Sequence, residues 1–198
     1  MEKGDCIMEA VNYDWIEEEK TRITLEEYEA LPEDVRVEIF EGFAQNMASP
    51  SRDHQRISTR LVTIISNYII GKNGGCEVFH APFDVKLSDD PLVIVQPDIL
   101  VVCDRDKLDE KRCNGAPDFI IEIVSPGNAS HDYVRKLGYY KDLGVREYWI
   151  LDPDTGSLSV YYFEGGIYCE HHDFTEKVRV HICEDLEIDL AQVAAVLR

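Results

Sequence analysis

The stretch Val93-Ile94-Val95-Gln96-Pro97-Asp98-Ile99-Leu100-Val101-Val102 is almost entirely aliphatic, and Asp98 is its one carboxylate. A second such stretch, Phe119-Ile120-Ile121-Glu122-Ile123-Val124, contains Glu122. Continuous runs of β-branched and aliphatic residues are typical of buried strands. A carboxylate there must be ion-paired, hydrogen-bonded or bound to a metal, because an isolated buried charge is too costly. Two such acids in neighbouring strands concentrate negative charge, and a divalent cation is the simplest way to relieve their repulsion.

The order of elements around Glu122 predicts a parallel strand pair joined by a crossover helix. We expect a strand at 119–125, a helix from Ser130 to Leu143 and a strand at 146–151. The other expected elements are helices at 24–31, 52–70 and from 190, a helical segment within 104–113, strands at 35–40, 43–47, 77–80, 83–87, 93–103 and near 178–182, and a hairpin ending at 168.

These elements define an α/β fold class, in which a mixed central β-sheet is flanked by helices and a β-hairpin region is added near the C-terminus. The charged, irregular residues 1–20 are expected to form a flexible leader. Residues 21–198 are then expected to form a single domain, which is a normal size for one hydrophobic core.

The charge of the chain argues against tight binding of a polyanion. The formal net charge is −19, from 39 acidic and 20 basic residues, whereas proteins that hold nucleic acid by its phosphates usually present a basic surface. The segment 135–146 is an exception, because Arg135, Lys136, Lys141 and Arg146 outnumber Asp142 there. We therefore expect nucleic-acid binding to be weak rather than absent.

Two further features of the sequence bear on the cellular compartment of the protein. No run approaches the roughly 20 consecutive apolar residues of a membrane span, and the first residues lack the pattern of a secretory signal. The six cysteines are scattered and form no C-x-x-C pair, so we expect most of them to be reduced, small hydrophobic residues. The sequence predicts a cytoplasmic protein with no membrane partner.

The candidate catalytic residues are Glu38, Asp98, Glu122 and Lys136. A crossover helix packs back against its own strand, so Lys136 on the inner face of the helix can approach Glu122. Two carboxylates can hold Mg²⁺, which polarises a phosphate and lowers the pKa of a bound water, and a nearby lysine stabilises charge. We expect Asp98 and Glu122 to bind the metal, Mg²⁺ or Mn²⁺, with Glu38 assisting.

Several motifs resemble known nucleases. Pro97-Asp98 followed by Glu122-Ile123-Val124 is similar to the PD-(D/E)XK nuclease superfamily, although Val124 stands where the usual lysine would be. The order of motifs over residues 21–195 resembles the Uma-two family of restriction-type endonucleases; the motifs are Val37-Glu38-Ile39-Phe40-Glu41-Gly42, His54, Gly115-Ala116-Pro117-Asp118, Ile121-Glu122-Ile123-Val124-Ser125-Pro126, Asp132, Lys136 and Glu147-Tyr148-Trp149-Ile150. This resemblance implies a restriction endonuclease-like core in which Lys136 replaces the missing lysine, and it makes His54 a further site candidate.

Each candidate also has a structural interpretation. Asp98 could cap a turn, Glu122 could pair with an arginine, and Glu38 could face water. Lys136 lies four residues after Asp132, which suits a salt bridge on an exposed helix face, and His54 could cap or cover a helix start. Asp118 competes for the role of Asp98, but it lies about 13 Å from Glu122 along the same strand.

The leading hypothesis is a metal-dependent endonuclease that hydrolyses DNA phosphodiester bonds, with weakly bound DNA as its partner and a homodimer as a candidate assembly. The alternative is a nuclease-fold binding or assembly module that does not cut. A hydrolase acting on another phosphate ester is a third hypothesis.

Overall fold

The computed structural model describes residues 22–32, 34–125 and 130–197, so the expected leader at 1–20 lies outside the described residues. The helices are α2 (Leu25–Glu29), α3 (Arg52–Gly71), α4 (Ser130–Asp142) and α5 (Leu190–Ala194). The strands are β1 (Val37–Phe40), β2 (Phe43–Asn46), β3 (Glu77–His80), β4 (Asp84–Asp89), β5 (Leu92–Val95), β6 (Ile99–Val102), β7 (Arg112–Asn114), β8 (Phe119–Ile123), β9 (Glu147–Asp152), β10 (Ser157–Tyr162), β11 (Tyr168–Asp173), β12 (Lys177–Arg179) and β13 (Glu187–Asp189).

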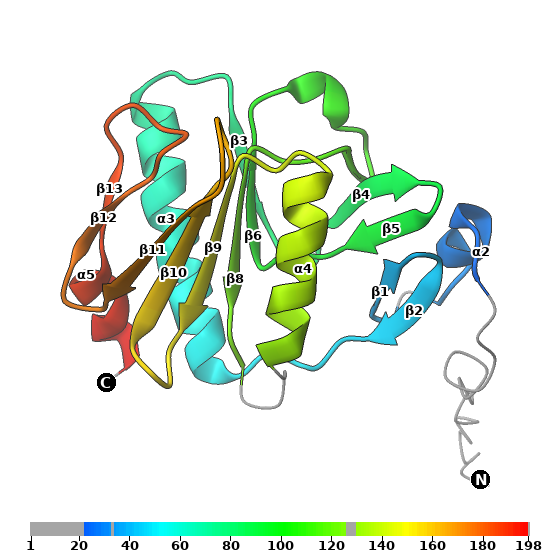
Figure 1. The fold of residues 1–198 in the computed structure, drawn as a ribbon, viewed down its shortest axis with the longest axis horizontal. Coiled ribbons are helices and arrows are strands. Elements are labelled where there is room, and N and C mark those ends of the chain that lie inside the picture. Colours follow the sequence, from blue (N-terminus) through cyan, green and yellow to red (C-terminus); the bar gives the residue numbers. More distant parts are fainter. Residues whose placement is uncertain (1–21, 33, 126–129, 198) are drawn as a thin grey trace, which may run out of the picture.

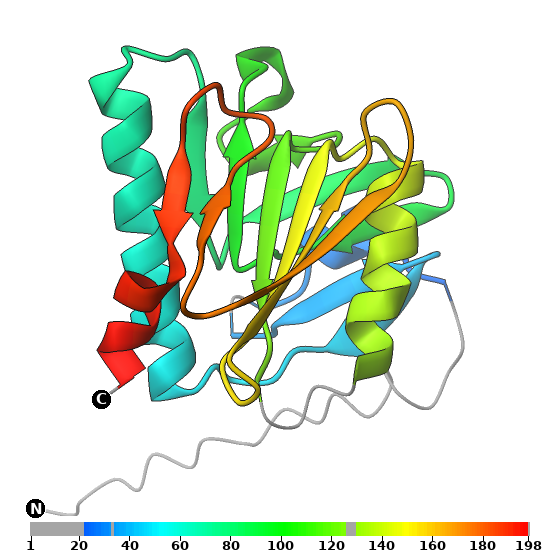
Figure 2. The same cartoon turned by 60° about the vertical axis from the view of Figure 1, so that its left-hand side comes forward.

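The central feature is a mixed six-stranded sheet with the order β11-β10-β9-β8-β6-β3. β8 and β9 pair in parallel and are joined by α4, as the strand-helix-strand pattern predicted. The sheet lies between α4 on one face and α3 with the C-terminal elements on the other (Figures 1 and 2). This arrangement confirms the expected mixed α/β architecture.

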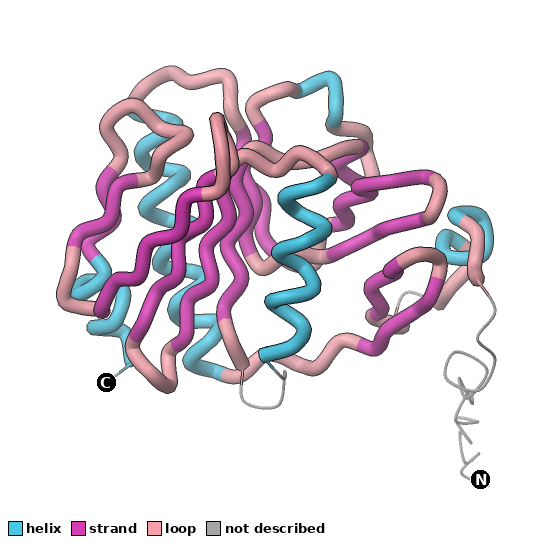
Figure 3. Tube along the Cα trace, viewed as in Figure 1, coloured by secondary structure: helices cyan, strands magenta, loops and turns pink. Residues whose placement is uncertain are grey.

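A second sheet has the order β2-β1-β5-β4-β7 and forms a separate group of strands in Figure 3. The expectation of one strand over 93–103 was wrong, because β5 belongs to this second sheet and β6 to the six-stranded sheet. Pro97 has no backbone N–H and restricts Gln96 to extended conformations, so sheet pairing stops where the chain passes between the sheets. Asp98 therefore lies at the junction of the two sheets.

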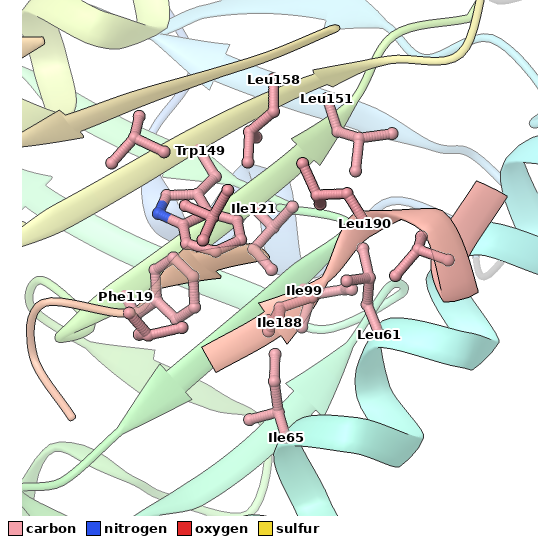
Figure 4. Packing of buried hydrophobic residues seen from close by; sticks show 14 of the residues in the cluster. Leu61, Ile65, Ile99, Phe119, Ile121, Trp149, Leu151, Leu158, Ile188 and Leu190 are labelled. Atoms are coloured by element: carbon pink, nitrogen blue, oxygen red, sulfur yellow. The ribbon is translucent and has the colours of Figure 1, made fainter. Parts of the chain in front are cut away.

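Side chains of β8 alternate between two hydrophobic clusters. Phe119, Ile121 and Ile123 pack with α3, α5 and the strands β12 and β13 in the cluster seen in Figure 4. Ile120 belongs to the opposite cluster, which includes Tyr140 of α4. Because strand side chains alternate, Glu122 projects to the same face as Ile120, toward α4.

Most of the cysteines were expected to be reduced, and Cys76 and Cys103 are the described exceptions, since they form a disulfide. β3 pairs with β6 so that Glu77 opposes Val102, and the next residues outward in this register are the two cysteines. Strand register brings them together, and sequence spacing alone does not reveal it. Cys113, Cys169 and Cys183 are free thiols. Among the described residues, no helix has the length and apolarity needed to cross a membrane.

Candidate functional site

Lys136 of α4 connects two buried carboxylates from different sheets. Its Nζ lies 2.9 Å from Glu38 Oε1 and 3.0 Å from Glu122 Oε1. The side chains of Lys136, Glu38 and Glu122 are each 6% exposed. Such burial is tolerated because the positive charge is paired and hydrogen-bonded. Lys136 therefore points into the protein, while the side chain of Asp132 lies outside the described part.

The helical repeat of α4 explains why this helix supplies more than one group. Tyr140 lies four residues after Lys136 and therefore on the same face, and its hydroxyl donates to Glu122 Oε1 over 2.8 Å. Tyr133, on the preceding turn, donates to the carbonyl oxygen of Ile123 over 3.3 Å. The inner face of α4 thus binds the end of β8 at three points.

Asp98 is held at the junction of the sheets by one strand and one helix. Its Oδ2 accepts a hydrogen bond from the backbone N–H of Ile123 over 2.8 Å and lies 2.9 Å from His54 Nε2. His54 is in the first turn of α3, where its backbone N–H donates to the N-cap residue Ser51. The Asp98 side chain is 17% exposed, so it is the most open of the three site acids.

Glu38 also links the junction to the site. Its Oε1 accepts the backbone N–H of Gln96 over 2.9 Å in addition to the Lys136 ammonium. The residues on either side of Pro97 therefore both form hydrogen bonds within the site. The backbone N–H of Gln96 donates to Glu38, and Asp98 accepts from the backbone N–H of Ile123. The sheet junction and the candidate site are the same place.

Burial raises the pKa of Glu122 to about 8, and the negative charges of Asp98 and Glu38 act in the same direction. The Lys136 charge and the Tyr140 hydrogen bond oppose this shift. Burial and the nearby carboxylates raise the pKa of Tyr140 well above its usual range. Tyr140 therefore remains a protonated hydrogen-bond donor at neutral pH.

All five residues named from the sequence, Glu38, His54, Asp98, Glu122 and Lys136, line one pocket of about 300 Å³. They come from β1, α3, the β5–β6 junction, β8 and α4. Continuing the register of Ile99 with Ile121 by one residue brings Asp98 level with Glu122. The structure thus assembles one acidic site with one lysine from separate parts of the chain.

The donor set fits a magnesium ion that keeps most of its waters. Asp98 and Glu122, which lie level in neighbouring strands, are the carboxylates that would hold a cation here. Within the described ranges, no three or more His, Cys, Asp or Glu residues are grouped to hold a metal. Mg²⁺ is commonly bound by one or two carboxylates with water, so two acids are sufficient.

Two other predicted features do not reach the site. Asp118 accepts the backbone N–H of Cys103 and pairs with Arg146, so it stabilises the opposite end of β8. Arg146 also pairs with Glu164, while Lys141 pairs with Asp142 at the surface. The predicted basic stretch is therefore divided, because Arg146 immediately precedes β9, at the end of the strand remote from Glu122.

Sequence reasoning missed Tyr140 and Arg36, which accompany the site. Tyr140 could have been found from its four-residue spacing to Lys136, and Arg36 from its two-residue spacing to Glu38. Arg36 lines the same pocket. By contrast, nothing in the sequence signals that Gln96 donates to Glu38, because that contact depends on how the second sheet pairs.

Comparison with known proteins identifies the family. Residues 25–195 match the family model Uma2, described as a putative restriction endonuclease. The chain belongs to the Uma2 family. An uncharacterized protein, slr1290, of Synechocystis sp. is 24% identical over 126 residues, which is 63% of this chain and 65% of that protein. The chain thus matches slightly less than two thirds of this relative.

The fold is shared with a solved structure. A putative nuclease of DUF820 from Anabaena variabilis has a TM-score of 0.74 and 24% identity, over 89% of this chain and 99% of that one. This likeness establishes the restriction endonuclease-like fold.

Proposed function

We propose that the protein is a metal-dependent endonuclease that hydrolyses DNA phosphodiester bonds. One observation carries the proposal: the Lys136 ammonium lies within 3.0 Å of Glu122 and 2.9 Å of Glu38, in the pocket that Asp98 also lines. Acid pairs with a nearby lysine suit phosphoryl chemistry, in which negative charge develops on the transferred group. The family description points to the same reaction class.

In this mechanism, Asp98 and Glu122 would hold Mg²⁺ or Mn²⁺, which would supply a Lewis acid and lower the pKa of a bound water. Lys136 keeps the acids together, and its charge stabilises negative charge that develops in the reaction. His54 orients Asp98 through the contact at Oδ2, and Tyr140 orients Glu122 through Oε1. Glu38 fixes the position of Lys136.

The alternative, a nuclease fold that does not cut, is favoured by one specific observation. Each acid already has a partner within the protein, since Lys136 pairs with Glu38 and Glu122 and His54 pairs with Asp98. The charge repulsion that would favour a cation is thus partly relieved without one. Activity has to decide between the two.

The test is cleavage of supercoiled plasmid DNA with Mg²⁺ or Mn²⁺, with EDTA as the metal-free control. We expect Asp98→Asn to reduce the rate at least about 100-fold, because a neutral amide is a poor ligand for a hard cation. Asp154→Asn is the matched control, because Asp154 is exposed in the turn between β9 and β10. Equal rates in wild type and Asp98→Asn would reject the proposed site.

A further inference from the structure

We propose that the guanidinium of Arg36 holds the phosphate of the substrate beside the acidic cluster. This inference rests on the proposed function and deepens it by naming the residue that recognises the anion. It makes the recognised unit a single phosphodiester rather than an extended run of phosphates.

Arg36 immediately precedes β1 and lies two residues before Glu38. The carbonyl of Arg36 accepts the backbone N–H of Met47 over 3.0 Å, so pairing with the neighbouring chain continues to this residue. Side chains alternate along an extended chain, so Arg36 and Glu38 project from the same face. Both side chains line the 300 Å³ pocket.

Arg36 differs from the other arginines that have a buried, unpartnered nitrogen. Its Nε is buried without a hydrogen-bond partner, and across residues 22–32, 34–125 and 130–197 its side chain forms no ion pair. Arg60, Arg112 and Arg135 also have one buried unpartnered nitrogen, but each uses another guanidinium nitrogen in a hydrogen bond. A buried donor left unsatisfied has lost its hydrogen bonds to water and gained none in the protein, so a bound anion would remove a cost that the free protein bears.

The charges of the pocket leave Arg36 as the cation for an anion. The other cation of the lining, Lys136, is held between Glu38 and Glu122. The lining also includes the acid Asp98, and the whole chain has a net charge of −19. A phosphate therefore gains little from the overall field and depends on a local contact. A guanidinium suits this role because its planar fork can donate two parallel hydrogen bonds to phosphate oxygens.

The experiment compares dithymidine monophosphate, which has one phosphodiester between two nucleosides, with thymidine, a single nucleoside that has none. Both are titrated by NMR in EDTA, so the readout needs neither metal nor cleavage. We expect wild type to bind dithymidine monophosphate more tightly than thymidine. Arg36→Gln should weaken dithymidine monophosphate about 10-fold and leave thymidine unchanged. Arg36→Lys keeps the positive charge but loses the planar fork of the guanidinium. Its affinity for dithymidine monophosphate should therefore lie between that of wild type and that of Arg36→Gln.

The control is Arg56→Gln, because Arg56 lies on the exposed side of α3 and pairs with Asp53; its affinities should stay within twofold of wild type. Equal binding of the two ligands by wild type, or affinity of Arg36→Gln within twofold of wild type, would overturn the inference. Should Arg36→Gln fail to fold, affinity of Arg36→Lys within twofold of wild type would overturn it equally.

Loss of cleavage in Asp98→Asn with phosphate binding intact would separate the two claims. Phosphate binding lost in Arg36→Gln without cleavage by wild type would reject only the nuclease proposal.

Discussion

Replacing Lys136 with methionine tests the charge cluster on which the site depends. Methionine retains most of the apolar volume of lysine and removes the ammonium, so Glu38 and Glu122 lose a partner at 2.9 and 3.0 Å. Both acids are 6% exposed and cannot recover the lost interaction from water. Removing one partner of a buried ion pair typically costs about 3–5 kcal/mol. Against a usual stability of about 5–15 kcal/mol, this is a fifth or more of the total.

The cost should depend on pH in a defined direction. The pKa of Glu122 is already raised to about 8, and loss of the Lys136 charge raises it further. At pH 6, below this pKa, Glu122 is already protonated and needs no partner for a negative charge, whereas at pH 9 it is ionised in wild type and loses its counter-charge in the variant. We expect Lys136→Met to lose more stability at pH 9 than at pH 6.

The assay is urea-induced unfolding followed by tryptophan fluorescence, since Trp149 is fully buried in the core. Lys141→Met is the matched control on the same helix, because Lys141 is 44% exposed and pairs with Asp142 at 3.3 Å. This exposed pair should be worth less than about 1 kcal/mol. A loss below about 1 kcal/mol for Lys136→Met, or one equal to the control, would refute the reasoning.

Two further predictions concern stability. Burial raises the folded-state pKa of Glu122 from 4.5 to about 8, so its contribution is fully present below pH 4.5 and is lost as pH rises through 8. In metal-free buffer, Glu122→Gln should remove a decline in unfolding free energy of about 3–5 kcal/mol between pH 5 and 9; an unchanged decline would contradict this. The Cys76–Cys103 disulfide, with a sequence separation of 27, should contribute about 3–4 kcal/mol. A double serine variant as stable as wild type in non-reducing urea unfolding would argue against the bond.

The sequence could predict those parts of the site that come from elements close together in the chain. Glu122 and Lys136 lie on a strand and on the crossover helix that follows it, so their approach follows from the handedness and packing of that unit. The match of 119–125 and 146–151 to β8 and β9 has the same origin. Tyr140 belongs to this class too, because helical spacing places it beside Lys136.

The remaining parts depend on pairing between distant segments. Glu38 reaches Lys136 because β1 joins the second sheet beside β5, and no local pattern specifies that neighbour. Gln96-Pro97-Asp98 looked like the middle of a strand, since the aliphatic residues on both sides are equally suited to either sheet. The Cys76–Cys103 bond depends on register in the same way. The division of the basic stretch followed from Arg146 pairing with Asp118 rather than lying beside Glu122.

The measurement that tests the central claim most directly is calorimetric titration of the protein with Mn²⁺ and Mg²⁺. We expect one cation per chain in wild type, and affinity at least about 10-fold weaker in Asp98→Ala and Glu122→Gln, because each variant removes one of two anionic ligands. Asp154→Ala should bind as wild type does. Binding that is undetectable in wild type, or equal in wild type and Asp98→Ala, would contradict a metal-dependent site at the junction of the two sheets.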